Sequence, residues 1–409
     1  MNNWKKATAV LATSAMLATA LAGCASSGEE KKETEQTEGK AKVVVWSHWK
    51  EKEFDALKEV AEAWAKETGN EVELKIDESE FQQYATAARS GEGPDIMFGT
   101  PHDNLGTFTT AGLLDEMPAD LVKEADYEAL AFPAVTVEGK KVAFPVSMES
   151  SVLFYNTEKV KTPPTTWADF IKAASEGGFM YDVNNFYFNY GFLSAYGGYV
   201  FKNNGGTYDT KDIGLGNEGA TKGYQLISDF VNKHKFMPAD ANGDIAKAKF
   251  TNKETAFYLS GPWDIPAMNE AKVPFGIMAF PAVEGGGQPK PFVGLQTAFV
   301  SSKSNNKKQS WDLLKYISEK GSVKFADLSA RIPVLKSALA DPKVKDNKNV
   351  SAIAAVAASG EPMPNIPAIQ TVWEPEKNNL TLLTSGKATA EQVAKDVTEQ
   401  VKQGIATQQ

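Results

Sequence analysis

The sequence has little of what metal, redox or anion-binding sites are built from: one cysteine, three histidines and two arginines in 409 residues. A single cysteine excludes an intrachain disulfide and a cysteine-based zinc site, and the scattered histidines form no metal-ligand motif. With only Arg89 and Arg331, bidentate clamps for phosphate or carboxylate ligands are scarce. A net charge of −9 argues against nucleic acid as a partner, because phosphate contacts need clustered basic side chains. We expect no cofactor and no metal.

What is present is ordinary globular material, with 42% apolar and 23% charged residues. This apolar content is too high for a disordered chain. The length exceeds what one compact core accommodates, so two lobes are expected. No tandem repeat of solenoid period occurs.

The N-terminal segment predicts export and lipid anchoring. Two lysines precede an uncharged apolar run at residues 7–21, which is too short and too poor in large side chains for a good membrane span. The run ends in Leu21-Ala22-Gly23-Cys24, which resembles the lipobox of bacterial lipoproteins. The resemblance implies a signal peptide at 1–23, cleavage before Cys24 and a diacylglycerol on its sulfur. The alternative is an ordinary secretory signal with an incidental cysteine.

The next segment predicts a flexible tether at residues 24–40, counting the lipidated Cys24. Residues 25–40 contain no large apolar side chain, and such a segment has a reach of about 20–25 Å. Acyl chains on one cysteine hold a soluble protein at a membrane, since each buried methylene contributes about 0.8 kcal/mol. We therefore expect a protein tethered to the outer face of the cell membrane and not embedded in it.

Strand and helix patterns alternate after the tether. Short apolar runs predict strands at 43–46, 71–77 and 96–98, and helical periodicity over 54–64 ends at Gly69. Ser79 and Gln82 are spaced as a capping box that opens the next helix. This order predicts a parallel sheet with helical crossovers. Further strands are expected at 142–146 and 152–156, and further helices at 167–175, 218–232, 309–319 and 393–401.

Aromatic side chains are concentrated at residues 179–201, where five of ten are tyrosines. Tyrosine presents an apolar ring and a polar tip, so it suits a wetted surface as well as a core. For Tyr187 and Tyr190, a cleft position and a core position both remain open.

Several segments, in order from about residue 42 to the C-terminus, resemble the maltose/maltodextrin-binding proteins of ABC-type sugar importers, in particular the lipid-anchored receptors of Gram-positive bacteria. The segments are Gly93-Pro94-Asp95-Ile96, His102-Asp103-Asn104, Ala143-Phe144-Pro145 with Glu149 and Leu153-Phe154-Tyr155-Asn156, Asn185-Phe186-Tyr187, Gly197-Gly198-Tyr199, Gly261-Pro262-Trp263, Pro291-Phe292-Val293-Gly294, and Met363-Pro364-Asn365-Ile366-Pro367 with Val372-Trp373. Each motif alone is weak, but their joint order and spacing are specific.

The resemblance implies an α/β protein with the two-lobed periplasmic-binding-protein fold of type II. Each lobe would be a mostly parallel sheet flanked by helices, with the ligand cleft between the lobes. By analogy the N-terminal lobe takes residues 41–147 and 298–340, and the C-terminal lobe takes 149–292 and 343–402. The chain would cross between them near Met148, 293–298 and 340–342. A monomer is expected on the same ground.

The resemblance also implies the site. A pyranose ring has apolar faces and a rim of hydroxyls, so its receptor needs aromatic platforms and polar side chains. Trp263, Trp373 and Tyr187 match family positions that stack on sugar rings, while Asp103 and Glu149 match carboxylates that accept hydroxyl hydrogen bonds. Further candidates are Tyr190, Asn185, Trp49 and Lys50. Trp263 has a core-filling alternative, Glu149 a hinge hydrogen bond, and Asp103 a helix cap.

Some family positions differ here. Gly99-Thr100-Pro101 stands where the maltose receptors have a tryptophan, Asn104 replaces an arginine, and Asn185 replaces an acidic residue. The implied function is a non-catalytic receptor that captures maltose or maltodextrin and delivers it to permease subunits. The alternatives are a receptor for a different oligosaccharide, such as a cyclodextrin or a non-glucose glycan, and a glycosidase using Glu149 and Asp103.

Overall fold

The computed structural model of the chain describes residues 40–79 and 81–408. The expected signal peptide, Cys24 and residues 25–39 of the tether lie outside this part. Within the described residues, no helix is long and apolar enough to cross a membrane.

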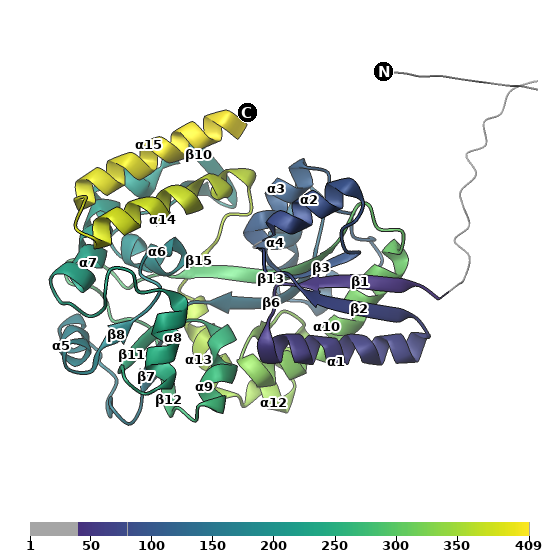
Figure 1. Ribbon diagram of the computed structural model, residues 1–409, viewed down its shortest axis with the longest axis horizontal. Coiled ribbons are helices and arrows are strands. Elements are labelled where there is room, and N and C mark those ends of the chain that lie inside the picture. Colours follow the sequence, from purple (N-terminus) through teal and green to yellow (C-terminus); the bar gives the residue numbers. More distant parts are fainter. Residues whose placement is uncertain (1–39, 80, 409) are drawn as a thin grey trace, which may run out of the picture. The chain divides into compact units, whose positions relative to one another are not determined.

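The first sheet is formed largely by the N-terminal part of the described chain (Figure 1). Its strands follow the order β14-β6-β13-β3-β1-β2, with β15 paired to β13. Their bounds are β1 (Lys42–Ser47), β2 (Glu71–Ile76), β3 (Ile96–Pro101), β6 (Phe144–Ser150), β13 (Phe292–Val300), β14 (Ile332–Pro333) and β15 (Glu361–Pro362).

The predicted strand–helix–strand order is confirmed at the start of this sheet. Strand β1 pairs in parallel with β2, with Val45 opposite Leu74, and in parallel with β3, with Val45 opposite Ile96. The crossovers are α1 (Glu51–Thr68) and α2 (Gln82–Ser90). Helix α1 buries Leu57, Val60, Ala61 and Trp64 along one stripe and ends where Gly69 adopts φ 74°. A left-handed C-cap residue is common at a helix end and favours glycine.

The predicted capping box at Ser79 is wrong in its register. Helix α2 begins at Gln82, so Gln82 is the first helical residue and not the third, and Phe81 occupies the N-cap with φ 71°. The Ser79 hydroxyl donates to Asp77 Oδ1 at 2.6 Å and accepts from the Gln83 amide at 3.1 Å. The aspartate holds the serine in the turn before the helix, which delays the helix start.

The second sheet has the order β12-β7-β11-β8. Its strands are β7 (Val152–Asn156), β8 (Phe179–Met180), β11 (Phe257–Ser260) and β12 (Phe275–Met278), and two hairpins lie apart from both sheets: β4 (Thr136–Val137) with β5 (Lys140–Lys141), and β9 (Phe201–Asn204) with β10 (Thr207–Ile213).

Both sheets are mixed. In the first, β13 runs antiparallel to β3 and to β6, and in the second β7 runs antiparallel to β11 and β12 while β8 is parallel to β11. The expected α/β class is confirmed, but the expected mostly parallel sheets are not found, since each sheet combines parallel pairings, such as β1 with β2 and β8 with β11, with antiparallel ones. In the first sheet, every antiparallel pairing involves β6 or β13.

Helices cover both sheets. Along the first sheet, α1 and α10 lie on one face and α2, α3 and α4 on the other (Figure 1). The remaining helices are α3 (Leu105–Thr110), α4 (Ala131–Val135), α5 (Trp167–Gly177), α6 (Phe186–Ser194), α7 (Glu218–Asn232), α8 (Gly243–Thr251), α9 (Ile265–Glu270), α10 (Lys307–Ser329), α11 (Lys336–Leu339), α12 (Pro342–Lys345), α13 (Lys348–Ala357), α14 (Gln370–Thr384) and α15 (Ala390–Gln408), with 3-10 turns η1 (His102–Asn104), η2 (Glu124–Asp126), η3 (Gly214–Gly216), η4 (Pro262–Asp264) and η5 (Pro367–Ile369).

Buried apolar side chains form two separate cores. The first core contains Trp64, Phe98 and Phe299, and the second contains Phe154, Phe179 and Phe230. Met148, in the middle of β6, packs against both cores. Two cores joined by long strands are what a chain too long for one core requires.

Helix α10 is longer than the periodicity at 309–319 predicted. It runs to Ser329, and a 23-residue helix spans about 35 Å at 1.5 Å per residue. Its first turns pack in the first core through Trp311 and Leu314, whereas Ala326 and Ala330 near its end belong to the second core. The range 298–340 therefore contributes side chains to both cores.

Candidate ligand-binding cleft

A cleft of about 590 Å³ lies between the two cores. This volume is typical of pockets that bind small molecules. Its lining comes from the segment after β1, from the ends of β3 and β6, from the middle of β13, and from α6, α8, η4 and α14. Eight of the nine expected ligand-binding residues line it: Trp49, Lys50, Asp103, Glu149, Asn185, Tyr187, Trp263 and Trp373.

Three partly exposed aromatic rings form one wall. Tyr187 comes from α6, Trp263 from η4 and Trp373 from α14. The Tyr187 and Trp263 ring centroids are 6.1 Å apart. The buried Phe292 ring lies 6.4 Å from Tyr187 and 6.3 Å from Trp373, so these two rings pack against one buried ring and Trp263 adjoins Tyr187. Rings with open faces beside polar groups are what a pyranose ring requires.

The backbone before Trp263 explains how this ring is positioned. Gly261 precedes Pro262, the first residue of η4, and proline fixes the backbone there. A Cβ at Gly261 would lie 2.2 Å from the Trp263 ring, so only glycine allows the indole to fold back over the strand end. The Gly-Pro-Trp sequence thus sets the ring at the cleft wall.

Asn185 and Tyr187 are linked at the start of α6. The Asn185 side chain caps the helix by accepting from the Tyr187 amide at 3.1 Å. The Tyr187 hydroxyl is buried and has no hydrogen-bond partner among the described residues. Burial raises the pKa of this phenol well above its ordinary value, so it stays a neutral hydrogen-bond donor. An orphaned polar group of this kind is costly unless a ligand or water satisfies it.

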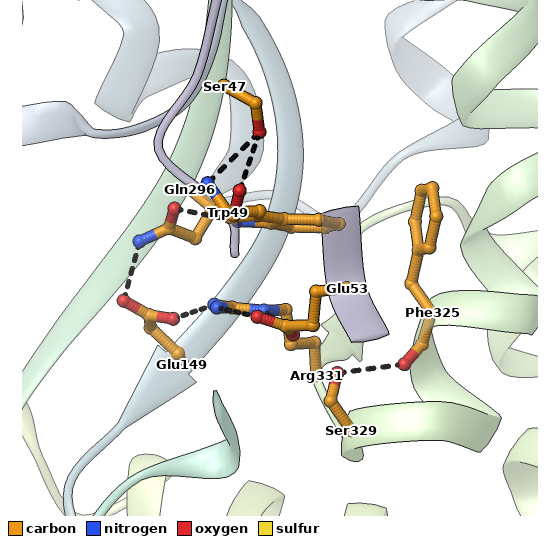
Figure 2. A network of polar contacts seen from close by, with 8 residues as sticks. All are labelled: Ser47, Trp49, Glu53, Glu149, Gln296, Phe325, Ser329 and Arg331. Carbon is orange, nitrogen blue, oxygen red and sulfur yellow. Dashed lines mark hydrogen bonds and ion pairs between the residues drawn. The ribbon is translucent and has the colours of Figure 1, made fainter. Parts of the chain in front are cut away.

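A buried network of charges lines the cleft beside strands of the first sheet, and Figure 2 shows its hydrogen bonds and ion pairs. Arg331 donates to both carboxylate oxygens of Glu53, at 2.6 and 2.9 Å, and forms a second ion pair with Glu149. The other Glu149 oxygen accepts from the Gln296 amide at 2.7 Å. The Arg331 side chain is only 4% exposed, so its two carboxylate partners are essential.

Trp49 closes this network into a ring. Its indole N–H donates to Gln296 Oε1 at 3.2 Å, and the Arg331 guanidinium lies 4.7 Å from its ring centroid. The Trp49 side chain is 2% exposed and packs edge-on against Phe98 and Phe325. Gly99 adopts φ 79°, and a Cβ there would lie 2.5 Å from the Trp49 ring. Trp49 therefore lines the cleft, but its main role is to support the Arg331 network.

Burial and neighbouring charges shift the pKa values of Glu149 and Arg331 in opposite directions. Burial raises the pKa of the Glu149 carboxyl, and Arg331 and Gln296 offset this only in part. Burial alone would lower the pKa of the Arg331 guanidinium, but Glu53 and Glu149 outweigh it and raise that pKa further. The buried Arg331 guanidinium thus forms ion pairs with both Glu53 and Glu149.

Asp103 occupies the end of the cleft near α14. The Gln370 amide donates to both its backbone carbonyl and its side chain at 3.1 Å, and Asn104 donates to the other carboxylate oxygen at 3.2 Å. Burial raises the pKa of Asp103 to about 7, with hydrogen bonds from Gln370, Trp373 and Asn104 lowering it in part. Neighbouring His102 is structural, since its ring accepts from the Leu295 amide and binds the Met363 carbonyl.

The sequence matches a protein family. A model of the bacterial extracellular solute-binding protein family matches residues 59–352. The chain belongs to this family.

Relatives of this solute-binding protein are named for two different kinds of oligosaccharide. The galactooligosaccharide-binding protein of Bacillus subtilis strain 168 is 31% identical over 380 residues, covering 88% of this chain and 89% of that protein. The maltooligosaccharide ABC transporter solute-binding lipoprotein of Streptococcus pneumoniae strain R6 is 28% identical over 423 residues, covering 99% of this chain and 98% of that protein.

A solved structure supports the fold. The maltose-maltodextrin binding protein of Alicyclobacillus acidocaldarius superposes with a TM-score of 0.85 at 37% identity, covering 88% of this chain and all of that chain. The resemblance to maltose and maltodextrin receptors read from the sequence, and the two-lobed binding-protein fold expected from it, are confirmed.

Tyr190 is the one expected ligand-binding residue that the cleft of this solute-binding protein does not include. Its ring stacks on Phe292 at 3.7 Å and it is 3% exposed, while its hydroxyl donates to Glu361. It borders a separate cavity of about 460 Å³ beside β9 and β10. The helical period puts Tyr187 and Tyr190 near one face of α6, so the partners decide: the Phe292 stack and the Glu361 carboxylate hold Tyr190 away from the cleft.

Lys50 reaches the cleft from an exposed position, where it pairs with Glu78 at 2.9 Å. The sequence analysis did not predict Glu53, Gln296 and Arg331, of which Glu53 and Arg331 are 278 residues apart along the chain. In the sequence, Arg331 stands out only as one of two arginines, a scarcity that argues against anion binding. Among the described residues, no three His, Cys, Asp or Glu side chains gather as a metal site.

Proposed function

We propose that this solute-binding protein is a receptor for maltodextrin-type oligosaccharides, tethered to the outer face of the cell membrane and serving the permease of an ABC importer. Its two lobes, expected at 41–147 with 298–340 and at 149–292 with 343–402, would close over the sugar about β6 and β13. The observation that carries this proposal is the cleft between the two cores, with Tyr187, Trp263 and Trp373 on one wall and polar side chains on the other.

The chemistry of the lining favours a neutral, hydroxyl-rich ligand. An aromatic ring that stacks on the sugar contributes about 0.5–1.5 kcal/mol of binding free energy in addition to that from the area it buries. A hydrogen bond to a charged group contributes about 1.5–3 kcal/mol. Glu149 and Asp103 offer carboxylate oxygens to hydroxyl groups. After the costs of association and closure, micromolar affinity, about −8 kcal/mol, is expected.

For the glycosidase alternative, Glu149 is a poor fit as the catalytic acid. A catalytic acid must carry a proton that it can transfer to the leaving group. Glu149 is held by the Arg331 guanidinium and the Gln296 amide, both of which donate to it as a carboxylate. Membership of a solute-binding family also points to binding without catalysis.

Anchoring rests on Cys24, which lies outside the described residues. The lipobox-like sequence before it and the lipoprotein name of the pneumococcal relative support a lipid-modified N-terminus. Metabolic labelling with a fatty-acid probe should label the wild-type chain, and a Cys24→Ser variant should lose the label.

A galacto-oligosaccharide receptor is the second candidate, and the Bacillus subtilis relative of that name favours it. Calorimetric titration of the chain with glucose, maltose, maltotriose, β-cyclodextrin and a galacto-oligosaccharide separates the two. Micromolar binding of maltotriose with weak binding of the galacto-oligosaccharide supports the proposal, and the reverse order contradicts it. Chromatography of the sugars after incubation should show no shortened products.

A further inference from the structure

A buried aspartate directly follows the Trp263 platform and holds a lysine at the cleft wall. Asp264 is 3% exposed. Its Oδ2 accepts from the hydroxyls of Tyr258 at 2.7 Å and Ser260 at 2.5 Å, both from β11. Its Oδ1 pairs with the Lys247 ammonium at 2.9 Å. Asp264 is therefore fixed from three directions, and it determines where the Lys247 ammonium lies.

Lys247 retains hydrogen-bonding capacity beyond this ion pair. An ammonium has three N–H donors. Within the part of the chain that the structure describes, Lys247 is paired with Asp264 alone, and its side chain is 32% exposed. Burial lowers the pKa of Lys247, but Asp264 outweighs it and Glu51 and Asp244 act in the same direction, so the lysine stays charged.

Lys247 lies at the junction between the cleft and a second cavity. It lines the 590 Å³ cleft, and it also lines an open groove of about 620 Å³ that includes Asp55 and Glu270. Glu51 and Asp244 border both spaces as well. The groove continues from the cleft, and its lining has no aromatic side chain, so sugar units that enter it would be bound through their hydroxyls.

We propose that Lys247 is a further ligand-binding residue that donates hydrogen bonds to hydroxyl groups of the sugar unit at this junction, with Asp264 as its positioning residue. This inference rests on the proposed oligosaccharide function and adds a preference for length. A chain too short to reach the junction gains nothing from Lys247, whereas a longer chain gains a charge-assisted hydrogen bond.

The alternative role of the Lys247–Asp264 pair is structural only, as an ion pair that joins α8 to η4. Chain length distinguishes the two roles. A structural pair would affect all sugars alike through the stability of the cleft wall, whereas a ligand contact acts on the sugars that reach it.

The test compares maltotriose and maltohexaose by calorimetric titration of Lys247→Met, Asp264→Asn and the double variant, with melting temperature measured on each. Lys249→Met is the matched control, since Lys249 lies on the same helix, is exposed, pairs with Glu254 and borders neither space. Loss of a charge-assisted hydrogen bond corresponds to about a tenfold weaker affinity, expected for maltohexaose in Lys247→Met. The loss for maltotriose should be smaller, and Lys249→Met should bind as the wild type does.

Asp264→Asn should weaken maltohexaose binding in the same direction, and the double variant should be no weaker than Lys247→Met alone, because Asp264 acts through the lysine. Lys247→Arg should restore part of the affinity. Equal losses for the two sugars, or no loss in Lys247→Met, would overturn the inference. Failure of the wild-type chain to bind either sugar would overturn the proposed function instead.

Discussion

The two walls of the cleft differ in how far their side chains are buried and paired within the protein. On the wall of the first core, Glu53, Arg331 and Trp49 are buried, and each donor has an acceptor within the protein. On the wall of the second core, Tyr187, Trp263 and Trp373 are only partly buried, and the Tyr187 hydroxyl has no described partner. The donors of the network on the first wall are paired without a ligand, whereas the second wall presents partly exposed rings that a ligand would cover.

This difference predicts different consequences for changes on the two walls. Removing a member of the closed network should mainly cost stability, because a buried charge loses its partner. Removing a ring from the open wall should mainly cost affinity, because that ring is already partly in water without a ligand. Substitutions on the two sides therefore test whether the contrast is real.

The largest effect is expected from Arg331→Met. The substitution leaves Glu53 and Glu149 buried without their shared cation, and breaking a buried ion pair in this way costs about 3–5 kcal/mol. Urea unfolding measures the loss. Arg89→Met is the control, since Arg89 is exposed in the last turn of α2. Equal stability of the two variants would show that the network does not hold the first wall together.

A smaller effect should appear in the pH dependence of stability through Asp103. Burial raises its pKa from 3.8 to about 7, so between these values the folded chain keeps a proton that the unfolded chain has released. The stabilisation is complete below pH 3.8 and is lost as the pH rises to about 7. The loss amounts to at most about 1.4 kcal/mol per pH unit.

Urea unfolding of the sugar-free wild type and Asp103→Asn at pH 5, 6 and 7 tests this expectation. The wild type should lose more stability than the variant over this range, and groups common to both, such as buried Glu376, cancel in the difference. Parallel pH profiles of the two proteins would mean that Asp103 is ionised in the folded chain throughout.

On the open wall, Trp263→Ala should weaken maltotriose binding by about 10- to 100-fold, since it removes both buried area and a ring contact. Its melting temperature without sugar should change little compared with that of Arg331→Met. Tyr316→Ala is the control: this ring is partly exposed on α10, bonds to Glu67 and does not border the cleft. Undiminished binding by Trp263→Ala would remove Trp263 from the site.

Local patterns predicted most elements but not all of their limits. The Glu71–Ile76 strand, helix α7 and the Gly69 helix stop follow directly from alternation, periodicity and the left-handed preference of glycine. The length of α10 and the start of α2 did not follow, because Ala326 and Ala330 are held by the distant second core and Ser79 is held by Asp77. Contacts outside a local window decide such boundaries.

By itself, the sequence determined the α/β class, the solute-binding family and eight of the residues that line the cleft, because ordered motifs such as Gly261-Pro262-Trp263 carry their own backbone geometry. Only the tertiary structure decided that Tyr190 stacks on Phe292 away from the cleft, that Arg331 joins Glu53 to Glu149, and that Lys247 is held by Asp264. The physical reason is that these roles depend on burial and on pairing between side chains remote in sequence. A charged residue becomes part of a binding site through the partners that the fold brings to it.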